Sequence, residues 1–383
     1  MTQSKSKADK RQRIAITTML KNPGPLLESY LTYHLSTGFD HIFLFFDDPH
    51  DPAILEAQSY RNVTVIRNDE SLRRRWEKTI SFTTDREVRE YANSLVMARQ
   101  ILNMEVALGL AVEKGIDWLL HIDVDELFYS PSQSVREHFQ SLADHGISRA
   151  IYLNHEVIPE SADVRDPFRE ATLFKKHPRT IEGKAISEEQ QRLIDECPQL
   201  PERFFSFYRN GKSVIRSREG TLPSGPHGFT LPEDRGLRAR LHTKAFNSKA
   251  AKLAGRFAPE FVRRLNQNLY PVRQVYSSDP MILHYPCCGF ENFWNKYVNY
   301  GRFADTWFGQ VDIASSIGSF TLESRDVVGS GDRGLAKDFY TRRVVMSDPG
   351  QVAKLIDAGL LRRIEGPAAL LEDLSVRRLQ TAS

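Results

Sequence analysis

The chain has 383 residues, of which 26% are charged and 40% hydrophobic, and its net charge is +3 from 52 basic and 49 acidic residues. This balance gives no argument for a nucleic-acid partner, and no apolar run reaches the roughly 18 residues of a membrane span. The composition is that of a soluble globular protein with one large domain or two.

The cysteines and the N-terminus bear on the compartment. Cys197 stands alone while Cys287 and Cys288 are adjacent, so the odd count argues against a disulfide scaffold and the spacing does not resemble a zinc motif. A reducing compartment follows as the default. Residues 1–12 are polar and basic, without the apolar core of a signal peptide. We therefore expect a cytoplasmic protein with a disordered basic tail at 1–12.

The first part of the chain predicts alternating strands and helices. The expected elements are a strand at 13–20, a helix at 25–38, strands at 41–47 and 62–67, a long helix at 87–114 and a strand at 118–122. This order predicts an α/β fold with a mostly parallel central sheet flanked by helices. No Gly-x-Gly-x-x-Gly follows the first strand and no Walker loop is present, so the common dinucleotide and P-loop sites lose support.

The rest of the chain is less regular. The expected elements are a helix at 135–145, a strand at 149–158, irregular chain at 159–200, strands at 203–208 and 212–216, a helix at 250–269, strands at 272–276 and 281–285, and helices at 290–298, 335–345 and 350–361. Asn210-Gly211 is favourable chemistry for a hairpin turn, so we expect the strands on either side of it to pair.

Carboxylates follow the apolar run that begins at Trp118. Asp123, Asp125 and Glu126 come at the C-terminal end of this predicted strand, where open α/β sheets bind ligands. Asp123 and Asp125 are two residues apart, so in extended backbone their side chains point the same way. Two oxygen ligands on one side suit Mg²⁺ or Mn²⁺ carrying a diphosphate. A solvated acidic turn that closes the strand is the simpler alternative.

Four segments, in order, resemble the glycosyltransferases of family 92 and the related family 2-like proteins, which have a GT-A fold. They are Lys21–Gly38 with Glu28 and His34, the Asp47-Asp48 pair, Arg99-Gln100-x-x-Asn103 running into Trp118–Phe128, and Ile282-Leu-His-Tyr285 followed by Phe293-x-x-Lys296. The step Lys212-Ser-x-Ile-Arg216, with His227 downstream, is also similar. Pro23-Gly24 departs from the pattern, because a glutamate commonly follows Lys-Asn there, and 158–200 has no match.

The resemblance implies a GT-A-like catalytic domain at 13–300, with a nucleotide-binding half at 13–128 and an acceptor half at 129–300, and a helical C-terminal extension at 301–383. It implies a metal-dependent transferase that moves a sugar from a nucleotide-sugar, favouring a UDP-sugar, to a glycan or other hydroxyl acceptor. The sugar and the acceptor stay open.

The same resemblance implies roles for individual residues. Asp125 is the first metal ligand for Mn²⁺ or Mg²⁺, Asp123 binds the metal or the donor ribose, and His284 is an additional ligand with His227 as its competitor. The other donor-binding residues are Thr17, Thr18, Asp47, Asp48 and Arg99.

An inverting transferase also needs a carboxylate base near the acceptor hydroxyl. We favour Glu291, with Glu156 as the second candidate. Two other functions stay open. A phosphohydrolase also uses Asp-x-Asp at a strand end, but Glu126-Leu127 stands where such enzymes usually carry Thr or Val. A non-catalytic protein that binds nucleotide-sugars or carbohydrates could have the same fold.

Overall fold

The computed structural model describes residues 11–182, 185–201, 203–232, 274–307 and 311–382. Most of the predicted tail, the helix predicted at 250–269 and the start of the strand predicted at 272–276 lie outside the described residues. Within the described ranges, no helix combines the length and the apolar character needed to cross a membrane.

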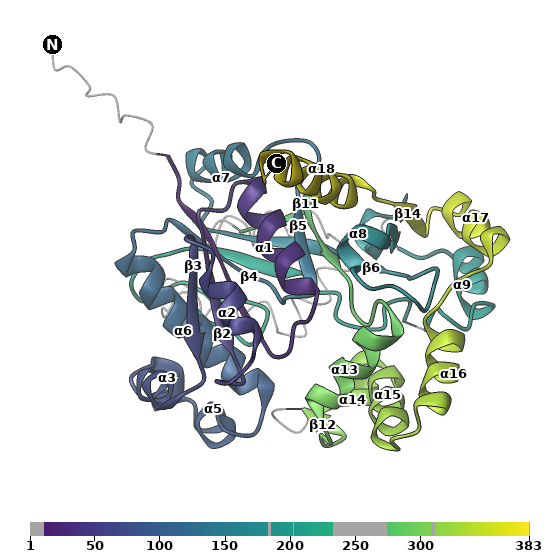
Figure 1. The fold of residues 1–383 in the computed structure, drawn as a ribbon, viewed down its shortest axis with the longest axis horizontal. Coiled ribbons are helices and arrows are strands. Elements are labelled where there is room, and N and C mark those ends of the chain that lie inside the picture. The colour runs from purple at the N-terminus through teal and green to yellow at the C-terminus, as the bar shows by residue number, and fades with distance from the viewer. Residues whose placement is uncertain (1–10, 183–184, 202, 233–273, 308–310, 383) are drawn as a thin grey trace, which may run out of the picture.

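Parallel strands form the N-terminal part of the central sheet. β1 pairs in parallel with β2 on one side and with β4 on the other, and β2 pairs in parallel with β3. The elements of this part are β1 (Ile14–Leu20), α1 (Leu26–Thr37), β2 (His41–Phe46), α2 (Ala53–Gln58), β3 (Val63–Arg67), α3 (Glu70–Trp76), α4 (Ile80–Thr84), α5 (Arg86–Tyr91), α6 (Val96–Glu113) and β4 (Trp118–His121). The predicted α/β fold, with helices flanking a central sheet, is confirmed (Figure 1).

Antiparallel strands complete this sheet. β8 lies antiparallel between β4 and β6, whereas β11 pairs in parallel with β6 and antiparallel with β5. At the edge, β7 pairs with β6 and β14 with β7, both antiparallel. The strands concerned are β5 (Glu126–Tyr129), β6 (Arg149–Val157), β7 (Leu173–Lys175), β8 (Lys212–Arg216), β11 (Gln274–His284) and β14 (Leu361–Arg363). The sheet is therefore mixed.

The remaining elements surround this sheet. They are α7 (Val135–Asp144), α8 (Pro167–Glu170), η1 (Pro178–Thr180), α9 (Glu188–Asp195), β9 (Leu222–Pro223), β10 (Phe229–Thr230), α13 (Phe290–Tyr300), β12 (Thr306–Trp307), β13 (Val311–Asp312), α14 (Ile313–Ile317), α15 (Phe320–Gly329), α16 (Arg333–Arg343), α17 (Pro349–Asp357) and α18 (Gly366–Ala382). The C-terminal part is joined to the sheet through β14, and α18 lies beside α1 (Figure 1).

Helices cover both faces of the sheet because side chains alternate along each strand. On one face, Leu44 of β2 belongs to the same buried cluster as Leu31 of α1 and Leu371 of α18. On the other face, Phe43 of β2 belongs to a second buried cluster with Leu102 of α6. The strands are thus apolar on both sides, as the sequence predicts for the centre of a parallel sheet.

Four predictions are wrong. The segment predicted as irregular at 159–200 contains α8, β7, η1 and α9, and the strands predicted at 272–276 and 281–285 belong, within the described residues, to the single strand β11. The long helix predicted at 87–114 is divided into α5 and α6, with Leu95 in extended backbone directly before α6. Asn93 and Ser94 lie at this break, and residues of these types favour turns and caps over helix interiors. The strand pair predicted at 203–208 and 212–216 does not form, because 203–208 has no strand and β8 pairs with β4 and β6.

Gly211 explains why the predicted turn directs the chain elsewhere. Its φ is +75°, and a Cβ added to it would lie 2.4 Å from the carbonyl oxygen of Tyr152 in β6. Only glycine fits this left-handed backbone and this close approach. The backbone at Asn210-Gly211 therefore packs closely against β6, and β8 continues from there as a central strand.

His34 connects α1 to the strand that follows the acidic segment. Its Nδ1 donates to the carbonyl oxygen of Tyr30 at 2.9 Å, and its Nε2 accepts from the backbone N–H of Phe128 in β5 at 3.2 Å. The ring is fully buried and packs against the rings of Tyr33 and Phe39. Burial lowers the pKa of His34 to about 3, so the imidazole is neutral in the folded protein.

We predict that His34 makes the protein less stable in acid. In the unfolded chain a histidine binds a proton below its ordinary pKa of 6.5, whereas His34 in the fold does not until about pH 3. The unfolded state therefore takes up more protons as the pH falls from 6.5, and the free energy of unfolding decreases. Denaturant unfolding between pH 7.5 and pH 4.5 measures this slope.

His34→Gln keeps a neutral donor and acceptor, so it should reduce the slope. His50→Gln is the control, because His50 is exposed. Other buried histidines, His121 among them, also have lowered pKa values and account for the slope that remains. An unchanged slope in His34→Gln would contradict the assignment.

Candidate functional site

The acidic segment forms a tight turn between two strands of the sheet. β4 ends at His121, Asp123 and Asp125 lie in the turn, and Glu126 begins β5. β5 then runs antiparallel to β11, with Glu126 opposite His284. The backbone N–H of Tyr285 donates to the carbonyl oxygen of Asp125 at 2.8 Å. The end of β11 therefore fixes the turn and brings His284 to it.

Asp123 is bound by a buried lysine. Nζ of Lys212, the first residue of β8, lies 2.5 Å from Oδ2 of Asp123 and 3.3 Å from Oε2 of Glu126. Nε2 of Gln100 in α6 donates to the other oxygen of Asp123 at 3.1 Å. Burial alone would raise the pKa of Asp123, but Lys212 and nearby histidines outweigh it and hold the pKa well below the ordinary aspartate value.

Asp125 is bound by a second lysine. Nζ of Lys296 in α13 lies 2.8 Å from Oδ2 of Asp125, and Nε2 of His284 lies 3.9 Å from the same oxygen. Burial acts to raise the pKa of Asp125, but Lys296 and His284 lower it below its ordinary value. Both carboxylates of the Asp-x-Asp pair are therefore ionised at neutral pH and each holds one ammonium group.

Glu126 differs from both aspartates. It is fully buried, and it accepts hydrogen bonds from the hydroxyl of Tyr208 and, at 2.8 Å, from the backbone N–H of Asp123. Burial raises the pKa of Glu126 to about 8, although Lys212 acts in the opposite direction. Glu126 thus ties the turn to the segment that carries Tyr208.

The rings of two histidines pack against the ring of Tyr208. The ring centroids of His227 and His284 lie 4.6 Å and 5.0 Å from that of Tyr208. Each histidine has a buried Nδ1 that finds no hydrogen-bond partner among the described residues. Burial lowers the pKa of His284 to about 4, so its imidazole is neutral and able to act as a ligand. The structure therefore brings both histidines that the sequence singled out to the acidic turn.

The predicted donor-binding residues lie in β1, directly after β2 and in α6. Thr17 and Thr18 are buried within β1, which continues to Leu20. Asp47, directly after β2, accepts two hydrogen bonds from Arg99 of α6, at 2.6 Å and 2.8 Å. Asp48 accepts from the backbone N–H of His50, at 2.9 Å. Asp47 and Arg99 are thus bound to each other, and their role toward a donor stays a prediction.

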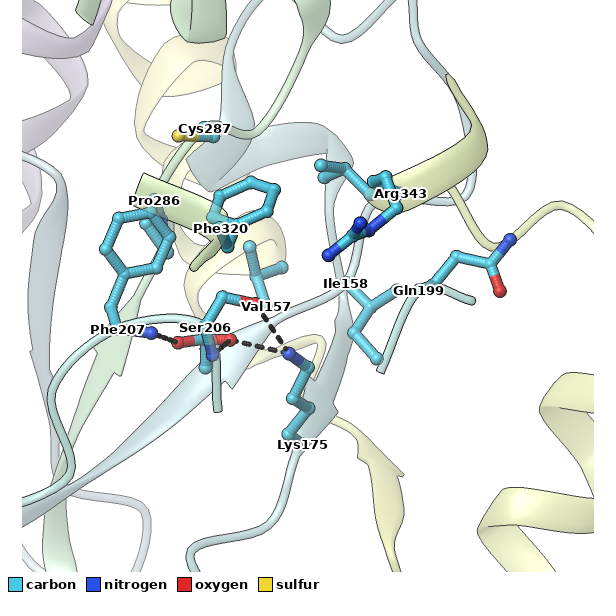
Figure 2. Close-up of a pocket in the computed structure, with 12 residues that line it drawn as sticks. Val157, Ile158, Lys175, Gln199, Ser206, Phe207, Pro286, Cys287, Phe320 and Arg343 are labelled. Atoms are coloured by element: carbon cyan, nitrogen blue, oxygen red, sulfur yellow. Dashed lines mark hydrogen bonds and ion pairs between the residues drawn. The ribbon is translucent and has the colours of Figure 1, made fainter. Parts of the chain in front are cut away.

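Glu156, the second predicted base, is buried and fully engaged. Its carboxylate accepts from Nζ of Lys175 at 2.6 Å and from the backbone N–H groups of Ser206 and Phe207 at 2.9 Å and 3.0 Å. These residues line a cavity of about 20 Å³, which has room for one water molecule but not for a sugar (Figure 2). In this state Glu156 holds the segment that leads to Tyr208.

Glu291, the preferred base, lies at the start of α13. It is 65% exposed and binds Arg333 of α16. Lys296, which faces Asp125, is five residues further along the same helix, so the two side chains point about 140° apart. In this conformation Glu291 does not face the acidic turn, and its catalytic role stays a prediction.

The predicted metal site needs a test against these contacts. Among the described residues, no group of three or more His, Cys, Asp or Glu side chains is arranged to hold a metal ion. Asp125 and His284 do form a pair, with Nε2 of the neutral imidazole 3.9 Å from Oδ2 of Asp125. The buried nitrogen of His284 without a partner among the described residues is the other one, Nδ1. Mg²⁺ commonly takes one or two protein ligands and completes its shell with phosphate oxygens and water. The pair therefore fits a cation that arrives with a diphosphate.

Sequence reasoning found Asp123, Asp125 and both histidines but gave no role to Lys212, Lys296, Tyr208 or Glu126. The two lysines belong to segments that carry the family resemblance, and a signal was therefore present. Their contacts with the aspartates span 89 and 171 residues of chain, and no local pattern reveals such pairs.

Comparisons with known proteins bear on the function. No protein-family model matches the sequence. The chain is similar to two Arabidopsis thaliana proteins that are both named glycosyltransferase-like. The first is 24% identical over 96% of this chain and 74% of its own length, and the second 23% identical over 96% of this chain and 64% of its own length. These relatives support a glycosyltransferase. The chain spans about two thirds to three quarters of their lengths.

Solved structures give weaker similarities. Core-mannan synthase A from Aspergillus fumigatus, in its Mn/GDP form, is 10% identical with a TM-score of 0.31, covering 90% of this chain and 88% of that chain. A mannosyltransferase from S. cerevisiae is 11% identical with a TM-score of 0.31, covering 88% of this chain and 82% of that chain. At these TM-scores no residue of this chain receives a role by superposition.

We predict that Glu156 and Lys175 form a structural pair. Their side chains are 2% and 3% exposed, so removing one partner leaves the other charge buried and unpaired. Glu156→Leu and Lys175→Met should each lower the free energy of unfolding by about 3–5 kcal/mol. The double variant should lose less than the sum, measured by denaturant unfolding. Additive losses would show that the pair is not coupled.

Proposed function

We propose that this protein transfers a sugar from a nucleotide-sugar, with a UDP-sugar as the first candidate, to a hydroxyl group of a glycan or another acceptor, with inversion of configuration. The observation that carries the proposal is the convergence of Asp123, Asp125, His284 and two lysines, one of them fully buried, at the C-terminal end of β4. Ligands bind at this edge in α/β sheets. The glycosyltransferase-like relatives support the same reaction.

In this proposal the edge of the sheet at β1 and β2 binds the nucleoside. Asp47 or Asp48, directly after β2, would contact the base, with Thr17 and Thr18 beside them in β1, the strand between β2 and β4. Arg99 of α6, which is bound to Asp47, would face the ribose or diphosphate. Asp123 would accept from the ribose or join the metal ligands. Its present bonds to Lys212 and Gln100 hold the carboxylate in position for either role.

A divalent cation belongs to the proposed reaction. Asp125 and His284 would hold Mn²⁺ or Mg²⁺, with His227, whose ring also packs against Tyr208, as the competing imidazole. When bound, such a cation neutralises the charge that develops on the leaving diphosphate. Lys212 adds a permanent positive charge beside the same position, and its burial strengthens its effect on a nearby phosphate.

We predict that Asp125→Asn loses metal-dependent nucleotide binding without unfolding. The substitution keeps the size of the side chain but removes the charged ligand. The measurement is a thermal-shift panel of UDP, GDP and CMP with their common sugars, with and without Mn²⁺. In the wild type, one of these nucleotides should raise the melting temperature, and it should do so only when the metal is present. Asp125→Asn should show no such shift.

Asp357→Asn, on the exposed end of α17, is the control and should respond as the wild type does. If Asp125→Asn binds the nucleotide and Mn²⁺ as tightly as the wild type in calorimetry, the metal assignment is wrong.

The acceptor base is tested by a pair of variants. If Glu291 is the base, Glu291→Gln should keep donor binding and reduce transfer at least about 100-fold. Unchanged turnover would exclude Glu291 and leave Glu156, which would first have to give up its bonds to Lys175 and to the backbone. Glu156→Gln is the corresponding variant. Release of the nucleoside diphosphate supports the transferase, release of inorganic phosphate a phosphohydrolase, and binding without any turnover a binding protein.

A further inference from the structure

Lys296 occupies the part of Asp125 that a metal ion would need. Its ammonium lies 2.8 Å from Oδ2, which is the Asp125 oxygen nearest Nε2 of His284. Mg²⁺ binds oxygen at about 2.1 Å, so an ion shared by Asp125 and His284 would meet the ammonium group on the same carboxylate. Two cations this close repel each other. Metal binding at this pair therefore requires Lys296 to move.

Lys296 is the lysine of the site that is able to move. Lys212 is fully buried and bound to both Asp123 and Glu126. Lys296 binds one carboxylate, and its side chain keeps 17% of its surface exposed. Its ammonium also lies 5.0 Å and 6.0 Å from the ring centroids of Phe207 and Tyr300, which are favourable neighbours for a cation off the carboxylate. One lysine is thus fixed and the other is exchangeable.

The charges indicate where Lys296 goes. Without ligands, Asp125 and Lys296 neutralise each other. A divalent cation adds two positive charges, and the diphosphate of a nucleotide-sugar adds two negative ones. The sum is again zero only if Lys296 stays in the site as a charged group. A buried charge needs a partner, and the diphosphate is then the anion available to it.

We propose that Lys296 is an exchange cation: it holds Asp125 while the site is empty, and it transfers to the donor diphosphate when a divalent cation takes its place on Asp125. The proposal rests on the proposed function. Lys296 then binds the leaving group, and it opposes metal binding in the absence of donor.

The test measures two affinities that should change in opposite directions. Isothermal titration of Mn²⁺ alone should give at least about fivefold tighter binding to Lys296→Met than to the wild type, because the competing ammonium is gone. Titration of UDP, and in parallel GDP, at saturating Mn²⁺ should give at least about tenfold weaker binding to the same variant. Lys296→Arg should keep part of the nucleotide affinity.

Lys337→Met is the matched control, because Lys337 is exposed on α16 and its ammonium lies 4.0 Å from Asp163. It should change neither affinity. Circular dichroism checks that each variant is folded. If Lys296→Met does not fold, Lys296→Gln takes its place in both titrations.

The proposal requires both changes, so any other result overturns it. Unchanged affinities would give Lys296 a structural role, and weaker Mn²⁺ binding would mean that it supports Asp125 instead of competing for it. A wild type that binds neither nucleotide contradicts the proposed function and the diphosphate half of the exchange. The titration of Mn²⁺ alone still decides whether Lys296 competes for Asp125.

Discussion

The site depends on one buried cation, Lys212. Asp123, Asp125 and Glu126 lie within four residues of chain in a turn that is largely removed from water, where unpaired carboxylates are strongly unfavourable. β8 supplies the positive charge because it is inserted antiparallel between β4 and β6. Its antiparallel direction brings its first residue to the C-terminal end of β4. The mixed sheet and the acidic turn are therefore parts of one arrangement.

Much of the fold could be predicted from the sequence because the central strands are short apolar runs that end in polar residues. The strands at 13–20, 41–47 and 62–67 match β1, β2 and β3 within one residue at each end. Predictions based on local turn chemistry were less successful. The chain does bend at Asn210-Gly211, but the carbonyl of Tyr152 and the pairing of β8 with two distant strands decide what the bend connects. Such tertiary contacts override local propensity.

The same division holds for the candidate site: the residues that a local pattern marks were predicted, and the long-range contacts between them were not. Asp123 and Asp125 are visible because they follow an apolar run that predicts a strand, at the end where α/β sheets bind ligands. The extended backbone that would point them the same way is a turn in the structure, and each aspartate binds a different lysine. His284 and His227 required the family resemblance, and in the structure the rings of both do pack against Tyr208. The two lysines were missed because an ion pair leaves no mark on either partner's local sequence. Glu156 illustrates the same limit, since only the structure shows that its carboxylate is already occupied by three donors.

Helix α6 sets a geometric limit on how the chain can vary. Its consecutive residues Arg99 and Gln100 hold the ends of two different strands, β2 through Asp47 and β4 through Asp123. Successive helical side chains point about 100° apart, so a single rotational phase of α6 satisfies both bonds. One residue added between Gln100 and Leu102 would rotate both side chains by about 100° relative to the buried face of the helix that follows them. Insertions and deletions before Leu95 are therefore compatible with this site, because they leave the phase of α6 unchanged, whereas those directly after Gln100 are not.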